Sequence, residues 1–306
     1  MHPVQDAGGR WHSRAPAKIN LALHVTGQRP DGYHDLDTLA VFTEFGDRIM
    51  LEPADADRFT ISGPMAGGLD PRAPNLVTGA RDLLRKAHGF GPVAIHLEKN
   101  LPLSSGIGGG SSDAAATLRA LDAAFTLGLD RQALAALSLP LGADVPMCVH
   151  GVPLRARGIG EAIEPLTGFA DLAIVLANPG EQVATPAVFR ALSRRDNPPL
   201  PAPPSGAGAG AGAGAEAIAG WLAQTRNDMQ DAAASLCPAI SETLTALAAE
   251  RPLLARMSGS GATCFALFSS LAEAQRTAGR IATAHPAWFV VATGTIASDG
   301  ETHEPD

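Results

Sequence analysis

Apolar and polar residues alternate with a period of two in several short stretches of the chain. Between residues 17 and 25 the large apolar residues fall on odd positions, while Lys18, Asn20 and His24 fall on even ones, which predicts a half-buried strand over residues 15–26. Residues 93–97 alternate in the same way, and another strand is expected around residues 49–51. Apolar runs over 171–177, 262–268 and 288–292 predict three further strands.

Apolar residues at helical spacing separate these strands. Residues 76–88 predict a helix that Asn75 caps and Gly89 ends. A stripe from Ala114 to Phe125 predicts a second helix, and further helices are expected within 216–250 and over 271–283. Because strands and helices alternate along the chain, the predicted fold class is α+β, or α/β, with two lobes.

The composition changes abruptly between residues 198 and 215. Prolines come first, and glycine then alternates with alanine from residue 206 to 215. This low-complexity stretch has too little apolar bulk to pack into a core. We therefore expect a flexible surface insertion there.

The overall composition excludes several classes of protein. Hydrophobic residues make up 45% of the 306 residues and charged residues 18%, so a sizeable core is available. The formal net charge of −8 argues against a nucleic-acid-binding protein, whose contact face is usually basic. It does not argue against phosphate binding, because backbone N–H groups can hold anions locally.

Cysteine usage and hydropathy point to a protein of the cytoplasm. The three cysteines are far apart and form no C-x-x-C pair, so we expect buried thiols and no disulfide or zinc site. Residues 1–14 are polar and lack the apolar region of a secretory signal. No stretch approaches the ~18 apolar residues of a membrane helix, so we expect no membrane partner.

A segment rich in glycine and serine stands between a predicted strand and a predicted helix. Glycine allows positive φ and lets a ligand approach bare N–H groups, and the helix N-terminus favours negative charge. The segment therefore predicts a phosphate-binding loop, in which Ser111 or Ser112 could also cap the helix. Its residues are Pro102, Leu103, Ser104, Ser105, Gly106, Ile107, Gly108, Gly109, Gly110, Ser111 and Ser112.

Three other interpretations of this loop fit less well. A P-loop requires a lysine after its last glycine, and none follows here. In a dinucleotide-binding fingerprint, Ser111 would replace the third glycine, and no acidic residue that ends a second strand is evident about twenty residues later. A plain linker would not connect a well-defined strand to a well-defined helix.

Three sequence blocks in order resemble the GHMP kinases. The first is Ala15-Pro-Ala-Lys18-Ile-Asn20-Leu, followed by Asp31-Gly32-Tyr33-His34; the second is the glycine loop; the third is Ser258-Gly259-Ser260-Gly261-Ala262. A Leu-Gly-Ala-Asp-Val-Pro stretch at 141–146 lies between the last two blocks, and the whole pattern spans roughly residues 15 to 268. The loop departs mildly from the family pattern at residues 103–105 and at Ile107.

The resemblance implies an ATP-dependent small-molecule kinase with two domains. It implies a GHMP kinase fold with an ATP-binding domain at 1–165, a substrate domain at 166–297 that contains the insertion, and a tail at 298–306. The flanking motifs resemble the branch that phosphorylates an alcohol carrying a cytidine diphosphate, in non-mevalonate isoprenoid biosynthesis. The expected cofactors are ATP and Mg²⁺, and we expect a monomer or a weak homodimer. Another GHMP kinase and a non-catalytic nucleotide sensor remain as alternatives.

Two residues are the candidates for catalysis. Asp144 is the candidate general base, although an aspartate after Gly-Ala also commonly caps a helix. Lys18 lies on the same strand face as Asn20, and its ammonium would steady the transferring phosphoryl group, unless it is an ordinary solvated lysine.

The resemblance implies the remaining contacts. The expected substrate-binding residues are Asn20, Tyr33, His34, Thr185, Gly259 and Gly261, and the pair Tyr33 and His34 would hold the cytidine. The expected adenine-side residues are Asn75, Lys99 and Asn100. No carboxylate cluster identifies protein ligands for a metal, and Asp113 and Ser112 remain open as candidates.

Overall fold

The computed structural model describes residues 1–203 and 214–298, which form two compact units. The first unit contains residues 1–17, 45–103 and 108–151, and the second contains the remaining described residues. Strands β2 (Trp11–Gln28) and β3 (His34–Pro53) each run through both units. The units therefore do not coincide with continuous domains at 1–165 and 166–297, and that division stays a prediction. Of the predicted tail, all but Ser298 lies outside the described residues.

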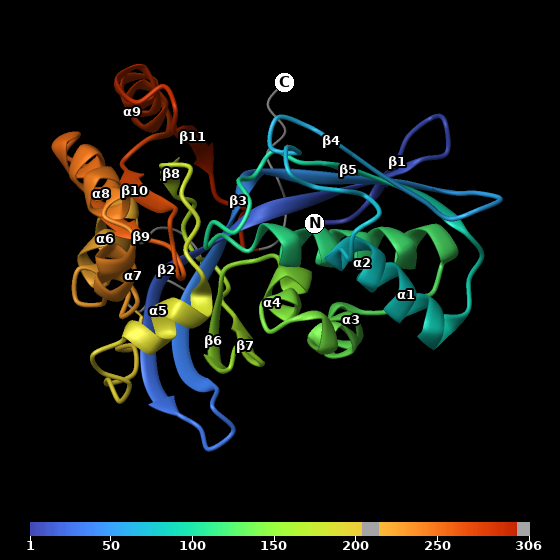
Figure 1. Cartoon of the computed structure of the whole chain (residues 1–306), viewed down its shortest axis with the longest axis horizontal. Coiled ribbons are helices and arrows are strands. Elements are labelled where there is room, and N and C mark those ends of the chain that lie inside the picture. Colours follow the sequence, from blue (N-terminus) through green and yellow to red (C-terminus); the bar gives the residue numbers. More distant parts are fainter. Residues whose placement is uncertain (204–213, 299–306) are drawn as a thin grey trace. The chain divides into compact units, whose positions relative to one another are not determined.

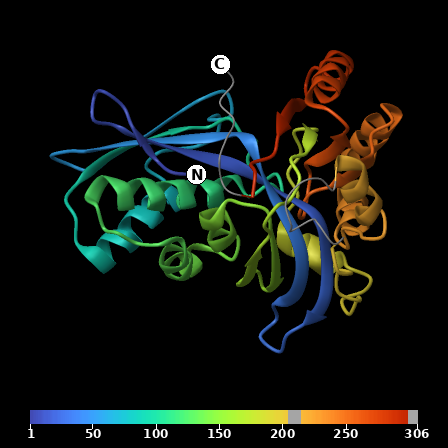
Figure 2. The ribbon, with the colours of Figure 1, turned by 180° about the vertical axis from the view of Figure 1, so that it is seen from behind.

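The first unit consists of strands backed by helices. Its strands follow the order β1-β2-β3-β5-β4, with β4 parallel to β5 and antiparallel pairing between β1 and β2 and between β3 and β5. Helices α1 and α2 run along one face of these strands (Figures 1 and 2). The other elements of this unit are β1 (Val4–Gln5), β4 (Arg58–Ser62), β5 (Val93–Glu98), α1 (Leu76–His88), α2 (Gly109–Phe125), α3 (Arg131–Ser138), the 3-10 helix η1 (Leu139–Leu141) and α4 (Val145–His150).

Helix α1 confirms the sequence prediction, and α2 corrects it. The side chain of Asn75 accepts a hydrogen bond from the N–H of Val77, and Gly89 ends α1 in the left-handed region at φ 64°. Helix α2 begins at Gly109, with Gly108 as its N-cap at φ 65° and no side-chain capping bond. The prediction that a loop serine caps this helix is therefore wrong, because both serines already lie inside the first turns.

The second unit contains a four-stranded antiparallel sheet of order β11-β8-β10-β9, against which α8 and α9 pack (Figure 1). Beside it, β6 pairs with the first part of β3 and with β7. The elements are β6 (Leu154–Gly158), β7 (Ala162–Pro165), β8 (Ala173–Asn178), α5 (Thr185–Ala191), α6 (Ala215–Leu222), α7 (Gln230–Leu236), α8 (Ala239–Ala249), β9 (Leu254–Met257), β10 (Cys264–Phe268), α9 (Leu271–Ala284) and β11 (Phe289–Gly294).

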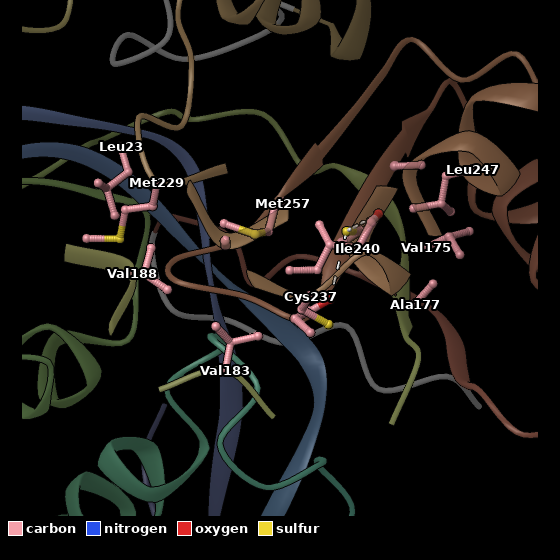
Figure 3. Close-up of a cluster of buried hydrophobic side chains, with 14 of the residues drawn as sticks. Leu23, Val175, Ala177, Val183, Val188, Met229, Cys237, Ile240, Leu247 and Met257 are labelled. Carbon is pink, nitrogen blue, oxygen red and sulfur yellow. Dashed lines mark hydrogen bonds between the residues drawn. The ribbon is translucent and has the colours of Figure 1, made fainter. Parts of the chain in front are cut away.

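A buried apolar cluster joins the sheet of the second unit to its helices. Figure 3 shows Val175 and Ala177 of β8 in this cluster together with Ile240 and Leu247 of α8. All three cysteines are buried thiols, as the sequence predicted. Within the described residues, no helix is both long and apolar enough to cross a membrane.

Residues 15–26 form a strand, as predicted, but the prediction that it is half-buried is wrong, because both faces of the strand are buried. Lys18 is 4% exposed, Asn20 2% and His24 1%. Residues of the second unit occupy the polar face. Asn20 Nδ2 donates to Thr38 Oγ1 at 2.8 Å, and a ring nitrogen of His24 lies 2.9 Å from the carbonyl oxygen of Pro198.

The described part of the proline-rich stretch lies mostly at the surface, as expected, but hydrogen bonds and the buried Leu200 hold it in place. The N–H of Leu200 donates to Asp37, and its carbonyl oxygen accepts from Arg155. The carbonyl oxygen of Ala202 accepts from the indole of Trp221 at 2.8 Å. Most of the glycine-alanine run, residues 206–213, lies outside the described residues.

Candidate functional site

The candidate site residues divide between the two units. The first unit contains Asn75, Lys99, Asn100, Pro102, Leu103, Gly108, Gly109, Gly110, Ser111, Ser112 and Asp144. The second contains Lys18, Asn20, Tyr33, His34, Ser104, Ser105, Gly106, Ile107, Thr185, Gly259 and Gly261.

In the first unit, the start of α2 has the chemistry of an anion site. The first N–H groups of a helix have no partner within the helix, and at α2 no side chain caps them. Gly108 holds the required positive φ, and the next two residues are glycines. Ser112 Oγ is buried and has no hydrogen-bond partner among the described residues. These amides and this hydroxyl suit phosphate oxygens.

A buried charged cluster lies beside the same turn. Lys99 Nζ donates to Asp113 at 2.8 Å and also to Asp47, and each of the three side chains is no more than 4% exposed. Burial raises the pKa of Asp113 well above its usual value, although Lys99 opposes this. Burial acts to lower the pKa of Lys99, but attraction to the two carboxylates outweighs it and raises that pKa. Asp113 therefore belongs to an internal ion cluster, and Ser112 is the better placed of the two metal-ligand candidates.

The predicted adenine-side residues have different surroundings. Asn75 uses its Oδ1 to cap α1, and Asn100 Nδ2 donates to the carbonyl oxygen of Gly46. The ammonium of Lys99 lies between the carboxylates of Asp47 and Asp113. Its backbone N–H donates to the carbonyl oxygen of Ser62, and its carbonyl oxygen accepts from the N–H of Met65. Adenine contacts by Asn75 and Asn100 stay predictions, whereas the geometry of Lys99 favours another role.

Asp144 stands at the N-cap position of α4, which packs against α2. The side chain is half-buried and makes no capping hydrogen bond. The alternative prediction, that the side chain of Asp144 caps this helix, is therefore wrong. Its role as general base stays a prediction.

In the second unit, the three sequence blocks meet. The N–H of Lys18, in the first block, donates to the carbonyl oxygen of Ile107 at 2.9 Å. Ser258 Oγ, in the third block, donates to the carbonyl oxygen of Gly106 at 3.2 Å. The N–H of Thr263 donates to the carbonyl oxygen of Ser105 at 3.1 Å. Segments separated by up to about 240 residues therefore form one hydrogen-bonded site.

The close approach of these blocks depends on glycine. Gly106 has φ 75°, and a Cβ atom at this position would lie 2.6 Å from the carbonyl oxygen of Ser258 and 2.7 Å from the nitrogen of Gly261. Gly259 has φ 55°, and a Cβ there would lie 2.6 Å from the carbonyl oxygen of Gly106. Two bare backbone turns thus face each other without room for a side chain.

Asn20 presents an unpaired acceptor beside the third block. Its N–H donates to Ser258 Oγ at 3.1 Å, while its Nδ2 donates to Thr38. Its Oδ1 is buried and has no hydrogen-bond partner in the described part of the chain. The bond to Thr38 fixes the amide so that Oδ1 remains available to a ligand. Sequence analysis identified Asn20 but missed Thr38, since no motif singles that threonine out.

The other predicted substrate residues lie around the start of β3 and the start of α5. Thr185 Oγ1 lies 2.7 Å from Ser260 Oγ, so the start of α5 reaches the third block. Tyr33 is 60% exposed, and the ring of His34 stacks on Phe189 with centroids 4.4 Å apart. Burial, with a smaller contribution from Arg195, lowers the pKa of His34, so its imidazole is neutral near pH 7. Sequence analysis missed Phe189, although it follows Thr185 by one helical turn.

Comparisons with known proteins agree with this geometry. A family model described as the GHMP kinases N terminal domain matches residues 75–152, and one described as GHMP kinases C terminal matches residues 214–287. A solved structure of 4-(cytidine 5'-diphospho)-2C-methyl-D-erythritol kinase is 35% identical, with a TM-score of 0.75 over 93% of this chain and 98% of that one.

Two curated relatives are similar over nearly their whole length. The 4-diphosphocytidyl-2-C-methyl-D-erythritol kinase of Brucella melitensis biotype 1 is 54% identical, covering 97% of this chain and 99% of the relative. The enzyme of the same name from Mesorhizobium japonicum is 51% identical with the same coverage. The chain belongs to the GHMP kinases and, within them, to the 4-diphosphocytidyl-2-C-methyl-D-erythritol kinase family.

Proposed function

We propose that this chain transfers the γ-phosphoryl group of ATP to the 2-hydroxyl of 4-diphosphocytidyl-2-C-methyl-D-erythritol. The products are ADP and the 2-phosphate, an intermediate of the non-mevalonate route to isoprenoids. The observation that carries the proposal is the convergence of the three sequence blocks on residues 105–107. The full-length relatives of that name support the choice of acceptor.

The ATP phosphates bind at the start of α2. The N–H groups of Gly109, Gly110 and Ser111 receive phosphate oxygens, and the helix dipole favours the charge. Ser112 Oγ would be the protein ligand of a Mg²⁺ ion bound together with ATP, because this buried hydroxyl has no hydrogen-bond partner among the described residues. When bound, such an ion neutralises phosphate charge and orients the γ-phosphoryl group.

Asp144 and Lys18 act on the acceptor. As the bond from the acceptor oxygen to the γ-phosphorus forms, the bond from that phosphorus to ADP breaks, and Asp144 takes the hydroxyl proton. The ammonium of Lys18 offsets the negative charge of the equatorial oxygens. Because the transition state is loose, a weak base that accepts the proton late is sufficient.

The cytidine and erythritol groups bind in the second unit. We assign the cytosine ring to the aromatic surface of Tyr33, His34 and Phe189, since bases stack on such rings. The neutral imidazole of His34 has a buried Nε2 without a hydrogen-bond partner among the described residues, and this atom is suited to the base edge. Asn20 Oδ1, Thr185 and the backbone of Gly259 and Gly261 contact the rest of the acceptor. Asn75 and Asn100 stay assigned to adenine.

A substrate panel tests the proposed function. ADP release should be stimulated by 4-diphosphocytidyl-2-C-methyl-D-erythritol and not by mevalonate, galactose or homoserine. Stimulation by one of the other acceptors would identify a different GHMP kinase, and ATP binding without any ADP release would indicate a sensor. The cytoplasmic location and the monomeric or weakly dimeric state also stay predictions.

Single variants test the two catalytic assignments. Asp144→Asn removes the base but keeps the shape, so kcat should fall by about 10²–10⁴ while ATP affinity is retained. Lys18→Met should lower kcat with little effect on ATP affinity. Normal turnover by either variant would remove that residue from the mechanism.

A further inference from the structure

The charged cluster of Asp47, Lys99 and Asp113 lies directly against the glycine that opens α2. A Cβ atom on Gly109 would lie 3.1 Å from Lys99 Nζ and 3.7 Å from Asp47 Oδ2. The ammonium is therefore in contact with the bare backbone of the first helical turn. No ligand or solvent is needed to hold it there, because its hydrogen-bond partners are the two carboxylates.

The cluster joins three segments of the first unit. Asp47, on β3, accepts the N–H groups of Asn100 at 2.5 Å and of Leu101 at 2.8 Å, which fixes the chain as it leaves β5. Asp113, on α2, is one turn beyond the amides that face the anion site. Lys99 bonds to both carboxylates. These bonds therefore hold the first turn of α2 against β3 and against the chain that follows β5.

Such a cluster is an unusual way to stabilise a core. Removing charged groups from water is costly, and apolar replacements of similar volume are often as stable or more so. Two carboxylates without the lysine would also place negative charge beneath a site for triphosphate. The ammonium of Lys99, which donates to both carboxylates, cancels part of this charge.

We propose that Lys99 is a positioning residue for the phosphate loop. Its ammonium, held between Asp47 and Asp113, orients the first turn of α2 and keeps uncompensated carboxylate charge away from the amides that receive the phosphates. The inference rests on the proposed function only in taking the ligand to be a nucleoside triphosphate. It assigns Lys99 to the phosphates, whereas the family resemblance assigned it to adenine.

Inorganic triphosphate is the decisive probe, because it has no base. Lys99→Met keeps the length of the side chain and removes its charge. By Coulomb's law at an effective dielectric constant of about 20, loss of one charge several Å away weakens binding about 10- to 100-fold. Calorimetry should therefore show a similar loss for triphosphate, ATP and GTP. The KM for the acceptor should remain within about twofold, since that ligand binds elsewhere.

Three variants control this experiment. Lys86→Met removes an exposed lysine from α1 of the same unit and should leave triphosphate binding unchanged. Adding Asp113→Asn to Lys99→Met removes the carboxylate left unpaired and should restore much of the lost affinity. Asp113→Asn alone removes a negative charge but keeps an amide oxygen that can accept from Lys99, so it should bind triphosphate as well as the unmodified chain or more tightly. That variant remains informative if Lys99→Met does not fold, as judged by thermal unfolding.

The possible results separate the hypotheses. Unchanged triphosphate binding by folded Lys99→Met, or weakened binding by Asp113→Asn alone, would overturn the positioning role. A loss confined to ATP, with triphosphate unaffected, would show an adenine contact and would also overturn it. If instead the unmodified chain binds triphosphate but never phosphorylates the cytidylated acceptor, the proposed function fails while this inference stands.

Discussion

Replacement of Gly106 by alanine is the sharpest test of how the glycine loop meets the third sequence block. The new Cβ would lie 2.6 Å from the carbonyl oxygen of Ser258 and 2.7 and 2.8 Å from the nitrogen and oxygen of Gly261. All three neighbours are backbone atoms, so no flexible side chain can move aside. The residue also has φ 75°, which an alanine adopts only with strain.

The free-energy cost of the left-handed backbone and the cost of the close contacts can be separated with a matched control variant. Left-handed backbone at a residue with a Cβ costs about 1–2 kcal/mol. Overpacking adds about 1–3 kcal/mol when the surroundings must shift. Gly128 has φ 72°, and a Cβ atom on it would have no neighbouring atom within 4 Å, so Gly128→Ala carries the first cost alone. Gly106→Ala should therefore be less stable than Gly128→Ala by about 1–3 kcal/mol.

Urea unfolding of both variants measures the free energies of unfolding, and steady-state kinetics measures the effect on the site. If the loop stays folded but is displaced, about 1–3 kcal/mol of lost transition-state stabilisation lowers kcat/KM for ATP about 5- to 150-fold. Gly128→Ala should keep normal kcat/KM. Equal stability and equal activity of the two variants would refute the close approach of these backbone turns.

Three further predictions concern other parts of the molecule. Phe189→Ala should raise the KM for the acceptor about 5- to 150-fold, the range for loss of one base-stacking ring, without changing the KM for ATP; an unchanged acceptor KM would exclude a stacking role. Arg85 lowers the pKa of Asp57 to about 2, so this carboxylate stabilises the fold above about pH 4 and loses its effect as the pH falls toward 2. Asp57→Asn should accordingly cost about 1–2 kcal/mol at pH 7, allowing for partial exposure, and urea titrations should show most of this difference lost only as the pH falls through about 2. Burial raises the pKa of Cys264, so iodoacetamide should not alkylate it until the chain unfolds, and rapid labelling of the native protein would contradict its burial.

Local patterns in the sequence predicted local structure well. Helix α1 runs over the residues expected from its apolar spacing, because its cap at Asn75 and its stop at Gly89 are both encoded within a few residues. The glycine loop was recognisable for the same reason. The meeting of the loop with Ser258 follows from the family resemblance and from no local pattern, since about 150 residues separate the two segments.

Tertiary packing accounts for what the sequence did not predict. The polar face of β2 was expected to be solvated, but Asn20 and His24 find hydrogen-bond partners that are distant in sequence, so burial costs them little. The stacking of His34 on Phe189 joins β3 to α5, and no spacing rule relates two such residues. The two aspartates that bind the ammonium of Lys99 are likewise not evident from a single sequence, since Asp47 lies about 50 residues before it; the adenine contact of Lys99 stays untested.

Gly106 and Gly108 belong to one motif, but each position requires glycine for a different reason. Gly106 belongs to the second unit, where sterics against Ser258 and Gly261 exclude any side chain. Gly108 belongs to the first unit, where it starts α2 at φ 65° and leaves the following amides uncapped for phosphate. Only Ile107 separates them, so two different backbone requirements fall within three consecutive residues of the sequence. The motif therefore needs glycine at 106 because a side chain would clash with the third block, and glycine at 108 because α2 starts there at positive φ.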